Sequence, residues 1–589
     1  MAVLAWPSAP RESFGNREMY ILGIHDGHNC GATLTRDAEV LASISEERLT
    51  RRKNDVGYPH NAIEEVLRIG GVNPDQLAGV VIASLFMHKE EYLRRVEDWY
   101  RVGRKEQEEE MRKPKEYLKV VFDHRSRERI EAVTSHLGVA SGCVEFLEHH
   151  LAHLAAAYYM APSAADGRPV LGLTCDGSGD GISATVSLCQ GNKIERISTT
   201  QRDASLGKIY SRVTYLLGMR PWEDEHKVMG LAAYVDPERC ANALKVLEGL
   251  LRAEDDSLEL SRTTDLTTNY CYEYLREAFE HVRFDVIAGA MQLFTERIIE
   301  KWVKNCIRKT GLKDVVCGGG VFMNVKANMV ISELPNIKSV YVVPSCGDES
   351  LSLGACLHKY HQMRGDTDHR QDVSDNIYWG GEFDNGCVRK AIEDELHGAE
   401  YNIQWTEDID QLVAERLAAG DIVARFAGRM EWGARALGNR SILADPYNGS
   451  VVHEISRIIK MRDFWMPFAP IILDRCADRY VINYEHVNSD SMMFAFRIRA
   501  DAYADFQAAT HLEDRTTRPQ VLRQRSNPRM YNVLEHFLSL TGRAALLNTS
   551  FNLHGYPIVY TPVDALRVFK KSGLRHLALE KAFISKASA

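Results

Sequence analysis

Two segments of this 589-residue chain repeat one short pattern, and that repeat constrains the fold more than any other feature. Residues 20–34 (YILGIHDGHNCGATL) and 170–186 (VLGLTCDGSGDGISATV) each combine an apolar strand, an Asp-Gly turn with small residues, and a second strand. The tip of such a hairpin presents backbone N–H groups and carboxylates, which suit phosphates and their metal ion. Two such hairpins, about 150 residues apart, predict a duplicated, two-lobed fold with a cleft between the lobes.

A third glycine-rich segment, residues 315–328 (VVCGGGVFMNVKAN), runs from an apolar strand into a helical stretch. Glycines at this point let a backbone approach a ligand closely, although a tight strand-to-helix turn is the alternative. Duplicated hairpins of this kind are the pattern of actin-like ATPases and sugar kinases. In those folds the third segment faces the nucleotide.

Apolar, β-branched strands alternate with helical stretches along the chain, which predicts an α/β fold. We divide the sequence into a leader (1–19), a first domain (20–363), a linker (364–376) and a second α/β domain (377–589). The linker is polar and lacks apolar periodicity. Residues 89–131 are unusually charged and predict a helical insertion, either a solvated surface element or a lid over an acceptor pocket.

Charge and composition exclude several classes of protein. The net charge of −9 gives no sign of a chain that coats nucleic acid or an anionic membrane. No apolar run approaches the roughly 18–20 residues of a membrane span. The first 18 residues lack a basic start and an apolar core, so we expect no secretory signal. The 12 cysteines include no C-x-x-C pair, which argues against a zinc ribbon or a disulfide framework and favours a cytoplasmic protein.

Residues 148–159 (EHHLAHLAAAYY) combine histidines with a helix-favouring alanine run. His149 and His153 are four residues apart, so they share one face of the predicted helix and can chelate one ion. His150 is rotated by about 100° and points elsewhere. Carboxylates from the glycine-rich turns, Asp176 and Asp348, are the best candidates to complete the shell. A mixed imidazole and carboxylate set suits iron or a similar divalent ion, while satisfied core histidines are the alternative.

Six sequence motifs, in the order in which they occur, resemble those of one known protein family. They are GHNCGATL with EERLTRRKN, EHHLAH, DGSGDG, DEHKVMGLAAY, CGGGVFMN and SCGDESLSLGA. The chain resembles the carbamoyltransferases of the NodU/CmcH/TobZ family from about residue 20 to about residue 581. The resemblance implies a first half similar to the universal tRNA threonylcarbamoyl-transfer protein, an actin-like fold with an iron site. It implies a second half similar to the YrdC domain, which makes carbamoyl adenylates.

The resemblance also implies roles for individual residues in the first half. It places the metal on His149, His153, Asp176 and Asp348. The histidine–aspartate pair usual in the family's hairpin appears here as His28 followed by Asn29, which leaves His28 as a candidate acceptor-side base. Lys53 is a candidate contact to phosphate or adenylate, with a surface lysine as the alternative. The residues expected to line the nucleotide are Lys227, Gly318, Gly319 and Asn324.

The second half concentrates arginines beside glycines and strand ends. Residues 425–446 (RFAGRMEWGARALGNRSILADP) carry four of these arginines. A planar guanidinium can bind two oxygens of a phosphate or carboxylate at once. The set predicts an anion site, although any single arginine can instead form a structural ion pair. By resemblance, Lys460, Arg518 and Ser550 bind carbamoyl phosphate and ATP. Further candidates to bind the nucleotide, which enters as ATP with Mg²⁺, are Arg429, Arg435, Arg440, Arg462 and Asn548.

Together these features predict an ATP-dependent O-carbamoyltransferase. Carbamoyl adenylate would form in the second domain and pass to the metal site of the first, where a hydroxyl of a small natural product accepts the carbamoyl group. The alternatives are an actin-like small-molecule kinase, a tRNA-modifying carbamoyl transferase and a non-catalytic ATP switch. The expected partners are ATP, carbamoyl phosphate and the acceptor, with no nucleic acid or membrane. A homodimer is the default oligomer.

Overall fold

Each predicted hairpin begins a five-stranded sheet, and the two sheets have the same topology. The computed structural model describes residues 18–95, 99–365, 376–397, 400–459 and 463–587. The first sheet has the order β3-β2-β1-β4-β5, and the second has the order β8-β7-β6-β11-β12. In both, the hairpin strands pair antiparallel and the later strands join in parallel. The predicted duplication is therefore present in the strand order and directions of a mixed α/β fold.

The strands of the first sheet are β1 (Tyr20–His25), β2 (Gly31–Arg36), β3 (Glu39–Ser45), β4 (Leu77–Ala83) and β5 (Val144–Leu147). Those of the second are β6 (Val170–Gly179), β7 (Ile182–Gln190), β8 (Lys193–Gln201), β11 (Asp314–Gly318) and β12 (Ser339–Val342). Their central strands are buried apolar runs, as expected for sheets covered on both faces.

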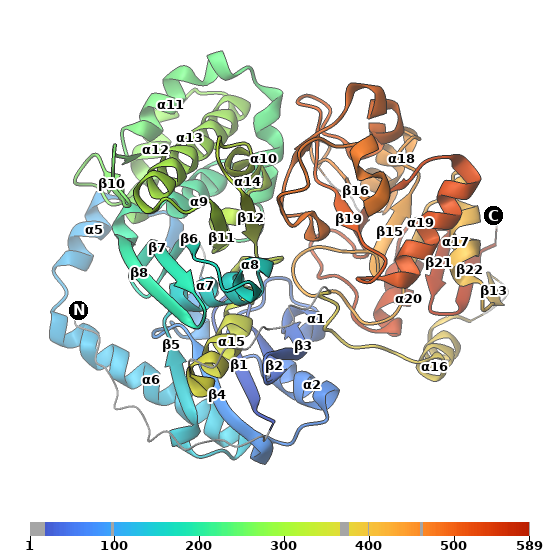
Figure 1. Cartoon of the computed structure of the whole chain (residues 1–589), viewed down its shortest axis with the longest axis horizontal. Helices are drawn as coiled ribbons and strands as arrows, with labels where there is room; N and C mark the ends of the chain where they lie inside the picture. The colour runs from blue at the N-terminus through green and yellow to red at the C-terminus, as the bar shows by residue number, and fades with distance from the viewer. Residues whose placement is uncertain (1–17, 96–98, 366–375, 398–399, 460–462, 588–589) are drawn as a thin grey trace.

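Two helices join the sheets. Helix α7 (His149–Tyr159) packs on β6 and β11, and α15 (Leu351–Arg364) packs on β1, β2 and β4. The two helices also pack on each other, so they form a layer between the sheets (Figure 1). Gly354 allows this approach, because a Cβ at that position would lie 1.8 Å from the carbonyl oxygen of Ala152. The chain thus returns from the second lobe to cover the sheet of the first.

The charged segment expected at residues 89–131 is helical. It forms α3 (Glu90–Leu93), α5 (Arg104–Met111) and the long α6 (Lys115–Leu137), drawn in light blue along the edge of the first half (Figure 1). Helix α6 leads into β5 and lies beside the first sheet. Helix α2 (His60–Gly70) packs on β2 and β3 of the same sheet.

The second half, drawn in orange and red, is built on a mixed eight-stranded sheet (Figure 1). Its order is β13 (Tyr401–Trp405), β22 (Ala582–Lys586), β21 (His576–Leu579), β14 (Val423–Phe426), β15 (Arg440–Ala444), β20 (Ala545–Ser550), β16 (Ala469–Leu473) and β19 (Gln520–Leu522). Helices α17 (Ile409–Ala418) and α19 (Pro528–Thr541) pack on each other, as do α16 (Asn385–Glu395) and α20 (Pro562–Lys571).

The two halves are joined by polar contacts to backbone carbonyls. Arg51 donates to the carbonyl oxygens of Pro557 and Ile558, at 2.8 and 2.7 Å, and Arg48 donates to that of Gly433 at 2.9 Å. Most of the predicted leader and linker lies outside the described residues. Among the described helices, none is both long and apolar enough to cross a membrane.

Candidate metal centre and anion site

Helix α7 presents two histidines to one point, as their spacing predicts. The Nε2 atoms of His149 and His153 lie 3.1 Å apart, and both side chains are almost fully buried. His150 faces away, with Nδ1 2.8 Å from the Thr174 hydroxyl and Nε2 3.0 Å from the Ile182 carbonyl oxygen. The helix begins where the Glu148 carboxylate accepts the backbone N–H groups of the first turn.

Two carboxylates complete this group. Asp176, on β6, has Oδ2 3.3 Å from His149 Nε2. Asp348, just before α15, has Oδ1 3.7 Å from His149 Nε2 and 3.5 Å from His153 Nε2. One ligand atom from each of the four residues lies within 4.8 Å of the others. The structure therefore brings together all four residues that the sequence suggested as metal ligands.

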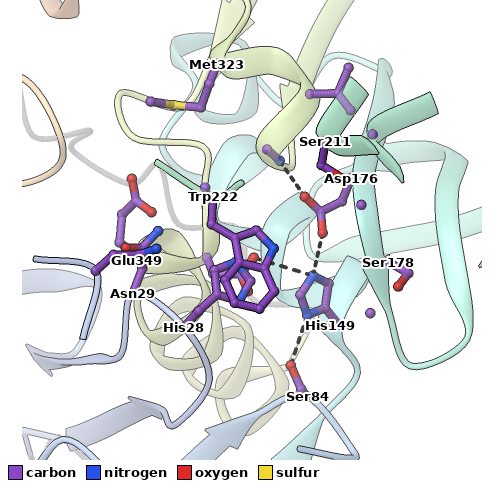
Figure 2. Close-up of a pocket in the computed structure, with 18 of the residues that line it drawn as sticks. His28, Asn29, Ser84, His149, Asp176, Ser178, Ser211, Trp222, Met323 and Glu349 are labelled. Carbon is purple, nitrogen blue, oxygen red and sulfur yellow. Dashed lines mark hydrogen bonds and ion pairs between the residues drawn. The ribbon is translucent and has the colours of Figure 1, made fainter. Parts of the chain in front are cut away.

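The donor set fits a divalent ion. The outer nitrogens of both rings are occupied, since His149 Nδ1 lies 2.9 Å from Ser84 Oγ and His153 Nδ1 lies 3.0 Å from Ser350 Oγ. Figure 2 shows Ser84 and Asp176 at opposite ends of the His149 ring. Such hydrogen bonds orient a metal-bound imidazole and fix which nitrogen carries the proton. The Nε2 atoms of His149 and His153, and not their Nδ1 atoms, are thus directed at the carboxylates.

Electrostatics also favour a cation here. Burial alone lowers the pKa of His149, but Asp348 and Asp176 raise it to about 9. Burial alone raises the pKa of Asp348, but the histidines around it hold that pKa well below its usual range. Two ionised carboxylates beside buried imidazoles make a site that holds positive charge, either a proton or a metal ion.

Two further histidines approach Asp348 from the first hairpin. His25 Nε2 and His28 Nδ1 lie 3.5 and 3.4 Å from its Oδ2 atom. The sequence analysis missed His25, although His25 and Asp26 form a histidine–aspartate pair three residues before His28. Burial lowers the pKa of His28, which leaves its imidazole neutral near pH 7. The His28 ring stacks on Trp222 at 4.7 Å between centroids, and Figure 2 shows Trp222 in front of the cluster.

The glycines of the turns make room for this arrangement. A Cβ on Gly179 would lie 2.0 Å from Cγ of His149, so the second glycine of DGSGDG is required by the His149 ring. A Cβ on Gly318 would lie 2.7 Å from the His153 carbonyl oxygen, and one on Gly319 would lie 2.4 Å from that of Cys175. Gly318 and Gly319 therefore let β11 approach α7 and β6. Neither is among the residues that line the cavity described below.

Lys208, on α9 (Leu206–Leu216), is a residue that sequence reasoning missed. Its Nζ lies 3.9 Å from the position of a Cβ on Gly177, beside the DGSG turn that carries Asp176. Burial lowers the pKa of Lys208 to about 8. No local motif marks this lysine, because the turn that it approaches belongs to a different part of the chain.

One cavity of about 4970 Å³ connects the cluster to the second half. Its lining includes His28, His149, Asp176, Asp348 and Lys208 from the first half. It also includes four of the candidates from the second half, namely Arg435, Asn548, Ser550 and Arg518. Lys53, Lys227 and Asn324 line it as well. Most of the predicted residues thus border one continuous space.

The residues that line the cavity differ in the ion pairs and hydrogen bonds that they already form within the protein. Lys227 bridges Asp224 and Asp463, at 3.1 and 3.0 Å, and Lys53 pairs with Glu223 at 3.2 Å. Asn324 caps α14 (Val325–Ser332). Arg435 differs, because its Nε is buried without a hydrogen-bond partner among the described residues and burial lowers its pKa. Of the described arginines, Arg435 is therefore well suited to receive an anion.

Two predicted arginines have structural contacts instead. The Arg440 guanidinium is fully buried, donates to four backbone carbonyls and lies 3.6 Å over the Phe426 ring. Arg429 donates to the carbonyl oxygens of Gly380, Leu41 and Trp379. Neither lines the cavity, so we do not retain them as anion ligands. Lys460 and Arg462 lie outside the described residues.

Comparison with known proteins identifies the family. The model of the carbamoyltransferase N-terminus matches residues 20–357, and that of the carbamoyltransferase C-terminus matches residues 414–586. The chain therefore belongs to the carbamoyltransferase family and is a transferase enzyme. The resemblance inferred from the six motifs is confirmed.

Related proteins are similar to the chain over most of its length. The chain is 31% identical to the uncharacterized protein MJ1051 of Methanocaldococcus jannaschii, over 96% of this chain and 99% of that protein. It is 29% identical to nodulation protein NolNO of Sinorhizobium fredii, over 96% of this chain and 80% of that protein. It is 27% identical to a 3'-hydroxymethylcephem-O-carbamoyltransferase of Amycolatopsis lactamdurans, over 62% and 65%.

Among solved structures, component A of the Acidaminococcus fermentans (R)-2-hydroxyglutaryl-CoA dehydratase is 14% identical to the chain. The match covers 59% of this chain and 100% of that one, with a TM-score of 0.32. That score is too low to support an argument about function.

Proposed function

We propose that this carbamoyltransferase uses ATP and carbamoyl phosphate to carbamoylate a hydroxyl group of a small natural product. The observation that carries the proposal is the cavity that borders both the histidine–carboxylate cluster and the Arg435, Arg518, Asn548 and Ser550 set. Its two ends suit the two halves of the reaction, activation of the carbamoyl group and its transfer. The relative named as an O-carbamoyltransferase supports a hydroxyl acceptor.

Activation belongs to the second half, which we assign as YrdC-like. Water releases inorganic phosphate from carbamoyl phosphate, and an oxygen of the resulting carbamate attacks the α-phosphorus of ATP. Pyrophosphate leaves and carbamoyl adenylate remains. Arg435 and Arg518 neutralise negative charge on the transferring groups, where electrostatic stabilisation contributes most. Lys460 and Arg462 are further candidates for this role.

Transfer belongs to the first half, which we assign as actin-like. The acceptor hydroxyl attacks the carbamoyl carbon, and AMP leaves with the bridging oxygen. His28, held through Nδ1 near Asp348, takes the hydroxyl proton at Nε2. Lys208 balances charge on the departing AMP. His149, His153, Asp176 and Asp348 would hold a divalent ion, with iron as the first candidate, and that ion would supply Lewis acidity at the carbamoyl group.

The cavity has a further use in this scheme. Carbamoyl adenylate is lost if it meets bulk water, so an enzyme that makes it at one site and uses it at another benefits from an internal route. Arg435 and Asp348 line the same cavity, which supports transfer of the intermediate within it.

The test is a product assay. The purified chain is incubated with ATP, Mg²⁺, carbamoyl phosphate and a panel of hydroxylated metabolites, and AMP, pyrophosphate and carbamate esters are measured by mass spectrometry. We expect AMP and pyrophosphate in equal amounts, and a mass gain of one carbamoyl group on one acceptor. ADP in place of AMP would instead indicate a kinase, and no AMP with any acceptor would exclude the adenylate route.

A double variant tests the metal centre. In the double variant His149→Ala/His153→Ala we expect bound metal and carbamoyl transfer to be lost while adenylate formation continues. If metal and transfer both survive, the assignment of these residues is wrong.

A further inference from the structure

A second group of potential metal ligands lies on the surface of the first lobe, where α2 meets the end of α6. It consists of His60, Glu64 and His136, each of which offers one ligand atom within 4.8 Å of the others. His60 and Glu64 are four residues apart on one face of α2, and His136 is in the last turn of α6. The proposed reaction does not use these residues.

The geometry resembles a prepared three-ligand site. Glu64 Oε1 lies 3.6 Å from His60 Nδ1 and 3.6 Å from His136 Nε2. These separations are too long for hydrogen bonds. They are close to the ligand–ligand spacing of about 3.4 Å that tetrahedral zinc imposes with bonds of about 2.0–2.1 Å. A bound ion would shorten each of these two separations by only a few tenths of an ångström.

Tyr58 gives this group a supporting contact. Its hydroxyl lies 3.1 Å from His136 Nδ1, which leaves Nε2 of the same ring directed at Glu64. The His60 and His136 rings stack at 3.7 Å between centroids, so both imidazoles are held beside the carboxylate. A hydrogen bond to the outer nitrogen of a histidine is what orients such a ring toward a metal.

We propose that His60, Glu64 and His136 bind a zinc-class divalent ion that clips α6 to α2. Two imidazoles and one carboxylate are a zinc ligand set with a fourth position left for water. His60 and Glu64 are 57% and 64% exposed, so an ion and its water have access, while His136 is 12% exposed and holds the far side.

Side-chain contacts of α6 connect this proposed surface site to the candidate metal centre. Two helical turns before His136, Arg129 forms a buried ion pair with Asp26 and donates to the Ser84 carbonyl oxygen at 2.9 Å. The Ser84 hydroxyl in turn contacts the His149 ring. An ion that fixes the end of α6 therefore stiffens the support of His149 without touching the reaction itself.

Zinc stoichiometry tests the proposal. The full-length chain is stripped with chelator, equilibrated with Zn²⁺ and freed of loose metal, and bound zinc is then measured by mass spectrometry. We expect His60→Ala/His136→Ala to hold one equivalent less than the wild type. The double variant His124→Ala/His281→Ala is the matched control, because it removes two exposed histidines, one of them opposite Glu128 in an i,i+4 pair that has no third metal ligand among the described residues. The control should keep the wild-type stoichiometry.

Two further measurements make the result decisive. Glu64→Gln changes an exposed side chain and should fold normally, and we expect it to weaken zinc binding at the surface site at least tenfold. Co²⁺ should give a tetrahedral visible absorption band in the wild type that is weaker in His60→Ala/His136→Ala, because the variant loses the surface site and keeps the His149 centre. Equal zinc content and equal Co²⁺ spectra in wild type and double variant would overturn the proposal. An equal loss in the control would also do so, because it would show nonspecific surface binding.

Discussion

At the scale of single residues, the candidate centre depends on side chains whose contacts cross the chain. His149 is held by Ser84 from the loop after β4 and by Asp176 from β6, and its backbone N–H donates to Asp180 at 2.8 Å. The same Asp180 carboxylate accepts the backbone N–H groups of Leu85 and Phe86. One carboxylate thus joins the start of α7 to the loop that carries Ser84.

Lys208 gives the first prediction at this scale. Substitution to Met keeps the length of the side chain but removes its charge beside the DGSG turn. If Lys208 balances charge on the leaving AMP, Lys208→Met should slow carbamoyl transfer about 10²-fold, which is the usual effect of losing one such group. Adenylate formation should be unchanged. The measurement is the rate of carbamate ester formation against the rate of pyrophosphate release.

The control for Lys208→Met is Lys193→Met, which changes an exposed lysine at the start of β8. Equal loss of both rates in Lys208→Met would show a general structural effect and contradict the specific role.

The sequence predicted part of this centre and missed the rest for a physical reason. His149 and His153 could be paired because helical spacing is a local property, and the same geometry correctly turned His150 away. Lys208, Ser84 and Trp222 carry no local signal, because their positions near the cluster arise only when distant segments pack. Arg440 was predicted to bind an anion because it lies beside glycines, but its guanidinium donates to backbone carbonyls instead. No sequence motif reveals those carbonyl contacts.

At the scale of elements, α6 and the loop after β4 act together. Arg129 forms two hydrogen bonds to Asp26, at 2.7 and 2.8 Å, and donates to the carbonyl oxygens of Ala83, Ser84 and Leu85. Both partners of the ion pair are buried. The helix therefore supports the loop through a guanidinium whose loss would leave a carboxylate buried and unpaired.

Arg129→Met should consequently destabilise the protein by about 3–5 kcal/mol, the usual cost of breaking a buried ion pair by removing one partner. It should also weaken metal binding at the His149 centre, because Ser84 loses its support. Denaturant unfolding and metal titration measure the two effects. Arg127→Met, an exposed position on the same helix, should change stability by no more than about 0.5 kcal/mol. Similar stability of the two variants would contradict the proposed support.

The start of α10 (Glu225–Leu231) supplies a pH-dependent prediction. Burial raises the pKa of Glu225 from its ordinary value of 4.5 to about 7, and its carboxyl group accepts the backbone N–H of Trp222 at 2.8 Å. Since the folded pKa lies above the unfolded one, the stability that this group contributes is complete below pH 4.5 and is lost as the pH rises through 7.

Glu225→Gln keeps the acceptor for Trp222 but cannot ionise. Between about pH 5 and about pH 8, the wild type should lose about 1–3 kcal/mol of stability relative to this variant. Denaturant melts of both proteins at the two pH values give the difference. If the difference does not change with pH, or changes in the opposite direction, Glu225 does not titrate in this range.

Element prediction from the sequence succeeded where a pattern was complete within one segment. The two hairpins, the α7 helix and the helical insertion all follow from local turn residues, apolar alternation or helix-favouring runs. The return of α15 to the first sheet could not be predicted, because it depends on Gly23 and Gly354 meeting carbonyl oxygens far away in the chain. That return is nonetheless what brings Asp348 to the histidines of α7.

At the scale of the whole molecule, the two halves share one cavity, so their chemistry can be coupled. Ala434 lines the cavity next to Arg435, and its backbone N–H donates to the Ser345 hydroxyl at 3.2 Å, three residues before Asp348. Its side chain is exposed to the cavity. A large side chain at this position would obstruct the space between the anion site and the metal centre without removing any proposed catalytic group.

Ala434→Trp should therefore uncouple activation from transfer. ATP and carbamoyl phosphate should still yield AMP and pyrophosphate, but the adenylate that cannot reach the acceptor is hydrolysed. The ratio of AMP to carbamate ester should therefore rise from near one to about ten or more. A tenfold change in this ratio corresponds to about 1.4 kcal/mol in the partitioning of the adenylate between hydrolysis and transfer. Ala419→Trp, on an exposed residue after α17 that does not line the cavity, is the matched control and should keep a ratio near one. A ratio that stays near one in Ala434→Trp while both rates remain normal would show that the intermediate does not travel through this part of the cavity.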